Sequence, residues 1–185
     1  MIIKAMRRES ASDWFEFFDN RAFADHEDWK GCYCTGFFMP RLEAYPGRAI
    51  KRKDYAAWLI EHELMKGYLG YENGRVVAWC NVNRKSAFPK LKEINEGGEE
   101  VLSIACFLVE KPYRRRGIAQ KLLSRIIKDA KQEGIAIIEA YPRPRAQTEY
   151  GKYRGPFSMY EKNGFKVERV MGMDVMRRHL AAGRG

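Results

Sequence analysis

The chain has 185 residues, which suits a single domain over residues 1–185 with a substantial core. Its composition, 45% hydrophobic and 31% charged with four cysteines, excludes a disordered chain and a disulfide-rich miniprotein. No apolar run approaches the roughly 18 residues of a membrane-spanning helix, and the start lacks a signal-peptide core, so we expect a cytoplasmic protein with no membrane partner. The net charge of +10 favours anionic ligands such as a phosphorylated cofactor, an acidic substrate or nucleic acid.

The first fifty residues predict a strand, a helix and a long irregular segment. Residues 2–7 are typical of a short strand, and Ser10 or Ser12 can cap a helix with a wide aromatic face. Residues 24–50 lack periodicity and contain several Gly and Pro residues. A connection this long within a compact domain is usually functional or flexible.

The cysteines are those of a reducing compartment. Cys80 and Cys106 lie in apolar runs and are expected to be small core residues. Cys32 and Cys34 form a Cys-Tyr-Cys triplet, but the sequence offers only three scattered histidines to complete a zinc site. No metal is therefore expected, and a reactive thiol or plain packing remains open for this pair.

A second helix and a hairpin follow. Apolar residues at helical spacing predict a helix from about Lys53 to Lys66, ended by Gly67. Two apolar segments, 68–71 and 76–80, flank Asn73-Gly74. Because Asn and Gly both accept positive φ, this is a strong hairpin signal.

The next elements predict a parallel strand pair. Val101–Val109 is a near-continuous apolar run, which indicates a strand buried on both faces. An amphipathic helix begins after Gly117 and ends at Gly134, and residues 135–138 form a second buried strand. Strand, helix and strand in this order imply a right-handed crossover between parallel strands, hence an α/β fold with a mixed sheet. The chain is expected to close with a short helix over 157–162 and strands at about 165–170 and 173–178.

The turn between the buried strand and the amphipathic helix carries the clearest chemical signal. The first helical N–H groups are unpaired there, and the helix dipole adds partial positive charge. Gly117 lets a ligand approach the backbone, while Arg114, Arg115 and Arg116 offer guanidinium groups suited to phosphate. The pattern is neither a Walker loop nor a dinucleotide fingerprint. It predicts a pyrophosphate site of another kind, the alternative being a solvated basic helix start.

This segment resembles the signature of the GNAT superfamily of acyl-CoA-dependent N-acyltransferases. The signature is Arg or Gln, two residues, Gly, one residue, then Gly or Ala, and Arg114, Gly117 and Ala119 match it in register. Downstream, Tyr160 and Gly164-Phe165 match the family's Tyr-x-x-x-Gly-Phe segment. The order of elements along nearly the whole chain fits as well.

The resemblance implies a single-domain GNAT-like fold: a mixed, mostly antiparallel sheet with helices on both faces and a splayed parallel strand pair that binds the cofactor. It also implies acetyl-CoA as co-substrate, with no metal, and a homodimer is frequent in such proteins. The residues that it assigns to the cofactor are Phe107, Leu108, Val109, Arg114, Arg115, Arg116, Gly117, Ile118, Ala119 and Gln120.

The resemblance further implies direct attack of an amine on the thioester, with Tyr160 as the acid that protonates the departing thiolate. A phenol with a pKa near 10 can do this, although a buried core tyrosine is the alternative. Some members of the family use a glutamate on the signature strand as the general base. At the corresponding part of this strand the chain has Ser103. Glu99 and Glu100 just upstream are the candidate bases, with Glu139 of lower rank and ordinary exposed glutamates as the alternative.

The acceptor is expected to be a small or peptidic amine between residues 24–50 and the connection 86–100. That connection carries an acidic cluster, Glu93, Glu96, Glu99 and Glu100, which would favour a cationic amine unless it only solubilises the loop. An alternative function is a non-catalytic CoA-binding or nucleic-acid-binding module, which the basic residues Arg143, Arg145, Lys152 and Arg154 keep open. Nucleic acid is the less favoured partner, because the aromatic residues sit mainly at core spacing.

Overall fold

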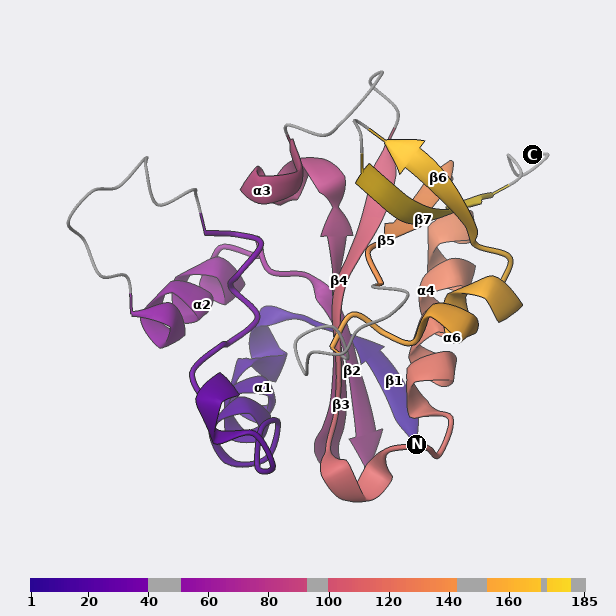
Figure 1. Ribbon diagram of the computed structural model, residues 1–185. Helices are drawn as coiled ribbons and strands as arrows, with labels where there is room; N and C mark the ends of the chain where they lie inside the picture. The colour runs from indigo at the N-terminus through magenta and orange to yellow at the C-terminus, as the bar shows by residue number, and fades with distance from the viewer. Residues whose placement is uncertain (40–50, 93–99, 143–152, 171–172, 181–185) are drawn as a thin grey trace.

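The computed structural model describes residues 1–39, 51–92, 100–142, 153–170 and 173–180, and its core is one seven-stranded sheet in the order β1-β2-β3-β4-β5-β7-β6 (Figure 1). The strands are β1 (Ile2–Ala5), β2 (Gly67–Glu72), β3 (Arg75–Arg84), β4 (Val101–Val109), β5 (Ile137–Ala140), β6 (Lys166–Val170) and β7 (Met173–His179). The helices are α1 (Ala11–Asn20), α2 (Arg52–Glu61), α3 (Pro89–Lys92), α4 (Ile118–Gln132) and α6 (Phe157–Lys162).

The pairing of the strands confirms the predicted fold class. Only β4 and β5 are parallel, and every other neighbouring pair is antiparallel. The β2–β3 hairpin turns at Asn73 and Gly74, whose φ angles of 50° and 77° are the positive values that the sequence indicated.

Helices cover both faces of the sheet, as expected. Side chains of α1 and α2, among them Trp14, Phe17 and Leu59, pack with Trp79 on one face. The apolar stripe of α4 packs on the other face, where it meets Ile104 and Phe107 of β4 (Figure 1). Each face therefore has its own buried cluster, and β4 contributes to both.

The parallel pair is short, which opens a gap in the sheet. β5 pairs with β4 only from Val101 to Ile104, and its own last strand residue is Ala140. At the same place the β3–β4 register shifts, so that Ala105 has no residue opposite it. A bulge of this kind bends its strand. Beyond Ile104 no strand in the described part of the chain pairs with the edge of β4 turned toward β5, which confirms the splayed pair.

Several predicted elements differ in detail from the structure. The second helix ends at Glu61 instead of Lys66, because Glu63 takes φ of 54° and the amides of Leu64 and Met65 both donate to the Leu59 carbonyl. β5 begins at Ile137, two residues after the predicted start at Ile135. The connection 86–100 contains the short helix α3, where only irregular chain was expected.

Gly67 opens β2 instead of ending a helix, and its missing side chain is a packing requirement. A β-carbon at this position would lie 2.2 Å from the carbonyl oxygen of Cys80 and 2.4 Å from the Trp79 ring. Both atoms belong to the buried centre of β3.

Gly67→Ala should therefore lower the free energy of unfolding by about 2–3 kcal/mol, as overpacking does in tight cores. Urea denaturation measures the change. Gly36→Ala is the matched control, since a β-carbon there meets no atom within 4 Å, and it should change stability by less than about 0.5 kcal/mol. Equal stability of the two variants would contradict this account.

Candidate functional site

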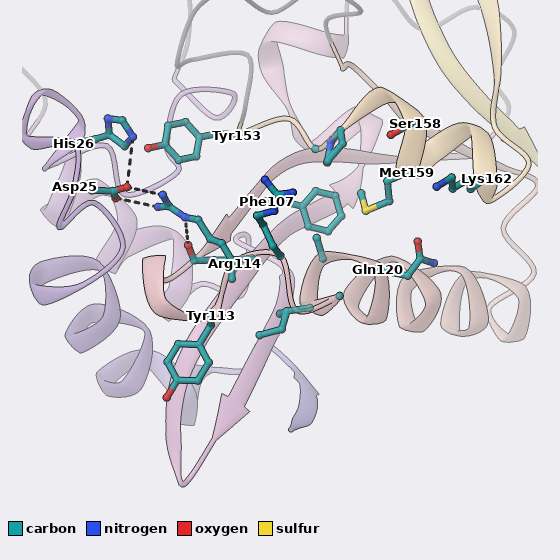
Figure 2. Close-up of a pocket in the computed structure, with 17 residues that line it drawn as sticks. Asp25, His26, Phe107, Tyr113, Arg114, Gln120, Tyr153, Ser158, Met159 and Lys162 are labelled. Atoms are coloured by element: carbon teal, nitrogen blue, oxygen red, sulfur yellow. Dashed lines mark hydrogen bonds and ion pairs between the residues drawn. The ribbon is translucent and has the colours of Figure 1, made fainter.

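A sizeable cavity lies at the open end of the parallel pair. It has a volume of about 740 Å³. Its walls come from the second half of β4, the start of α4 and the start of α6, with Asp25 and His26 at one end (Figure 2). These elements meet there because the crossover through α4 returns the chain beside β4, leaving the helix start at the open end of the gap.

The start of α4 forms one wall. Gly117 precedes the helix with φ of 74°, and no side chain caps the first turn. Arg115 also takes a positive φ, 61°, in the tight turn that leads into the helix. The unpaired amides and the dipole of this helix therefore point partial positive charge toward the cavity.

Most of the residues predicted for a cofactor line this cavity. Those that line it are Phe107, Val109, Arg114, Arg115, Gly117, Ile118, Ala119 and Gln120. Two do not. Leu108 is buried in the cluster beneath α1 and α2, on the opposite face of β4, and Arg116 is exposed with its guanidinium over the Tyr113 ring. Strand alternation explains Leu108, since its neighbours face the other way.

Arg114 lines the cavity, but its guanidinium is engaged by protein groups. It forms a two-pronged ion pair with Asp25, at 2.5 and 3.0 Å, and its Nε donates to the Val109 carbonyl (Figure 2). Hydrogen bonding to Arg114 lowers the pKa of Asp25. Because its side chain is committed, Arg114 serves to tie the segment after α1 to the end of β4.

The free edge of β4 is also partly occupied. The amide of Phe107 donates to the carbonyl of Tyr153 at 2.7 Å. Tyr153 is half-buried, and its ring packs against Phe23 and Trp29. The chain around Tyr153 thus lies where a strand partner of β4 would otherwise run.

Tyr160 is fully buried behind the cavity wall. Its hydroxyl donates to the Arg154 carbonyl at 2.8 Å and lies against the backbone of Gly155, which lines the cavity. Burial raises the pKa of Tyr160 well above its ordinary value, so the phenol keeps its proton. One layer of backbone separates that proton from the cavity.

The candidate bases occupy very different surroundings. Glu100 is exposed and ion-paired with Arg84, and Glu99 lies outside the described residues. Glu139 is fully buried between two cations, Lys85 Nζ and Arg177 Nε, each 2.7 Å from its carboxylate.

Ser103 is joined to this buried carboxylate through Tyr141. The Ser103 and Tyr141 hydroxyls are 2.9 Å apart, and the Tyr141 hydroxyl donates to Glu139 at 2.5 Å. Burial, with the nearby Glu139 charge, raises the pKa of Tyr141. The arrangement joins β4, β5 and β7 at the closed end of the gap, which marks Glu139 as an anchor for the strands.

Glu139→Gln should lower the free energy of unfolding by about 3–5 kcal/mol, because the substitution leaves the buried Lys85 ammonium without its counter-charge and removes one of two carboxylates beside Arg177. Chemical denaturation measures the loss. Asp174→Asn removes one partner of an exposed pair with Arg169 and should cost less than about 1 kcal/mol. A Glu139→Gln protein as stable as that control would show that the buried charges are not coupled.

Several residues around the cavity were missed by the sequence reasoning. They are Asp25, His26, Tyr113, Tyr153, Gly155, Pro156, Ser158, Met159 and Lys162. His26 Nε2 lies 3.7 Å from Asp25 Oδ2. Asp25 and His26 fall in the long segment that was expected to be functional, but only the folded chain shows that Asp25 reaches Arg114, 89 residues away in sequence.

For Cys32 and Cys34 the structure favours a packing role over a reactive thiol. Cys34 is buried and Cys32 half-buried, and burial raises the pKa of the Cys32 thiol to about 11. A thiol with so high a pKa has little thiolate at neutral pH. Within the described ranges, no cluster of His, Cys, Asp and Glu could hold a metal ion. No helix in those ranges is long and apolar enough to cross a bilayer.

Comparison with known proteins identifies the class to which this fold and site belong. The family model described as "Acetyltransferase (GNAT) family" matches residues 3–155. The chain belongs to this family, as the signature at Arg114, Gly117 and Ala119 predicted. The curated proteins contain no match by sequence.

Solved structures agree on the fold. The GNAT domain of S. lividans PAT has a TM-score of 0.59 at 20% identity, with 96% of this chain and 89% of that one covered. An aminoglycoside acetyltransferase from an uncultured soil metagenomic sample has a TM-score of 0.56 at 18% sequence identity. The match covers 90% of this chain and 92% of that one. The putative acetyltransferase yncA from Salmonella typhimurium, solved with acetyl-CoA, has a TM-score of 0.55 at 15% sequence identity. The match covers 100% of this chain and 96% of that one.

Proposed function

We propose that this GNAT protein transfers an acetyl group from acetyl-CoA to a primary amine, by direct attack within a ternary complex. One observation carries the proposal. A single cavity brings the edge of β4 at Phe107 and Val109, with which no described strand pairs beyond Ile104, together with the uncapped start of α4 at Gly117. A strand edge suits the amides of a pantetheine arm, and a helix start suits a pyrophosphate.

In this proposal the pyrophosphate lies on the amides from Arg115 to Gln120. Gly117 leaves the backbone open to the phosphates, since no atom stands within 4 Å of where its β-carbon would be. The Arg115 and Lys162 side chains, which line the same cavity, add positive charge. Arg114 contributes through its tie to Asp25 instead of through a phosphate contact.

The acetyl carbonyl would be polarised by a strand amide, and the Phe107 N–H is the proposed donor. A preorganised N–H stabilises the charge that develops on the oxygen during attack. For this role the Tyr153 carbonyl must release Phe107 when the cofactor enters. The exchange replaces one hydrogen bond with another, so its net cost is small.

Tyr160 is the proposed general acid for the departing thiolate, and Glu99 and Glu100 are the proposed bases, acting through water. A phenol whose pKa is raised remains protonated, as an acid must before it donates. Its route to the sulfur runs past Arg154 and Gly155, so a small shift of that backbone accompanies the transfer.

Gly117→Glu should abolish measurable acetyl-CoA binding, because it sets a carboxylate where the pyrophosphate must lie. Isothermal titration with acetyl-CoA measures the affinity. Gly134→Glu is the matched control: Gly134 ends the same helix with φ of 71° and equally open surroundings. Both variants should lose similar stability, while only Gly117→Glu loses the ligand. Unchanged affinity in a folded Gly117→Glu protein would refute the assigned site.

Tyr160→Phe should lower kcat by roughly 10²–10⁴-fold while the affinity for acetyl-CoA stays the same. The variant keeps the ring packing against Phe107 and Phe165 and removes only the hydroxyl. Release of free thiol from acetyl-CoA, followed with an amine acceptor, gives kcat. Full activity would make Tyr160 a core residue only.

A non-catalytic CoA-binding module is the second candidate. The observations that favour it are the two protein carbonyls that already hold the Phe107 amide and the Tyr160 hydroxyl. A screen of amines by thiol release decides between the two. Any polynucleotide binding would be recognised by its steep salt dependence. We also propose a cytoplasmic location and a homodimer for this protein.

A further inference from the structure

A second, smaller cavity lies beside the first, between β4 and the segment that follows α1. Its volume is about 60 Å³, and Tyr153 lines both cavities. Its walls are mainly aromatic rings and thiols, from Phe23, Trp29, Phe37, Cys32, Cys34 and Cys106. A group held here is adjacent to Phe107, the proposed site of the acetyl carbonyl, because Ala105 and Cys106 of the same strand form the floor.

One polar group in this wall lacks a partner. Asn81 is 1% exposed, and its Nδ2 donates to the Cys34 carbonyl at 3.1 Å. Its Oδ1 has no hydrogen-bond donor among the residues that the structure describes. A buried carbonyl oxygen without a donor is costly, so a ligand N–H at this point would be stabilised.

The charges around the cavity do not suit a polycation. No carboxylate lines it in the described part of the chain, and the Arg154 guanidinium lies 4.9 Å from the Phe37 ring centre. Of the acidic cluster expected to bind a cationic amine, Glu100 pairs with Arg84, and Glu93, Glu96 and Glu99 lie outside the described residues.

The size of the cavity limits what can enter. A dry cavity of about 150 Å³ holds benzene, whereas this one is about 60 Å³. A short alkyl chain fits such a space, and an aromatic ring does not fit without displacing Phe37 or Trp29.

We infer that this cavity binds a short alkyl group of the acceptor amine, with Asn81 Oδ1 accepting a hydrogen bond from the amine nitrogen. The inference rests on the proposed function and narrows its substrate to small aliphatic primary amines. An apolar wall disfavours the ammonium form, so the amine reacts as the free base. A neutral amine does not have to be deprotonated by a side chain before it attacks. The reaction therefore depends less on a general base at Ser103, the position where some members of the family carry a glutamate.

The reaction then balances without further reagents. The nitrogen lone pair forms the C–N bond with the thioester carbonyl carbon, and the C–S bond breaks with its electrons going to sulfur. The nitrogen loses one proton to water, and the thiolate gains one from the acid, which gives the amide and free CoA. The acid then regains a proton from that water, so no proton is gained or lost overall.

The first test compares acceptors on the wild-type chain. Thiol release from acetyl-CoA is measured with n-butylamine, benzylamine and spermidine. We expect kcat/KM for n-butylamine to exceed the other two values by at least ~10-fold, the scale on which pockets separate such groups. Preference for spermidine or benzylamine would overturn the inference and leave the proposed function standing. Thiol release with none of a wider amine panel would overturn both.

The second test alters the cavity. Phe37→Ala enlarges it and should raise the benzylamine to n-butylamine ratio of kcat/KM by at least ~10-fold. Phe38→Ala is the matched control: Phe38 is also buried beside Phe88 but lines neither cavity, so the ratio should stay unchanged. An equal ratio in both variants would contradict the assignment.

The third test concerns the polar group. Asn81→Leu preserves most of the volume and removes the oxygen, and should raise KM for n-butylamine about 10-fold while KM for acetyl-CoA stays constant. Thermal denaturation checks that the variant folds. If it does not fold, the acceptor ratios of the wild type and of Phe37→Ala still decide the matter. An unchanged KM for n-butylamine in a folded variant would remove Asn81 from the site.

Discussion

The early separation of β4 from β5 is the feature on which the rest of this structure depends. Four residues of β4 pair with β5, and beyond the bulge at Ala105 no strand among the described residues pairs with this edge, where the Tyr153 carbonyl accepts from the Phe107 amide. In a closed sheet the polar groups of Phe107 and Val109 would be satisfied by another strand. Here the Phe107 amide donates to the Tyr153 carbonyl and the Val109 carbonyl accepts from Arg114. Both residues line the same cavity as the start of α4, so the topology places a strand edge beside a positively polarised helix start.

A gap of this kind needs a firm closed end, and the buried charges around Glu139 provide it. The carboxylate sits on β5, one of its cations on β7 and the other just after β3. Ion pairs in a low-dielectric interior gain little net stability over apolar packing, but their geometry is exacting. They fix how the strands meet at the point from which they diverge. This explains why Glu139, a candidate base from sequence, is unsuited to leave its partners during turnover.

The helices and strands could be predicted from local sequence signals, whereas contacts between distant segments could not be predicted. Asn73-Gly74, the apolar run of β4 and Gly117 each act within a few residues, so the hairpin, the buried strand and the helix start were predicted correctly. The pairing of Arg114 with Asp25 and of Phe107 with Tyr153 joins segments 89 and 46 residues apart. No periodicity encodes such partners. The motif predicts a phosphate contact for the Arg114 guanidinium, whereas its ion pair with Asp25 involves a neighbour that the motif does not contain.

The two cavities are physically linked by Tyr153, and this bears on the order of events in the proposed reaction. Its carbonyl holds the Phe107 amide, and its ring lines both spaces and packs on Phe23 and Trp29. A ligand that takes over the Phe107 amide must shift the Tyr153 backbone, and the ring attached to it borders the space for the acceptor. In the proposed reaction, cofactor entry would therefore reshape the cavity proposed for the acceptor through one residue. An acceptor that relies on apolar contact is more sensitive to such a change than one held by long-range charge, since dispersion is lost within an ångström of separation.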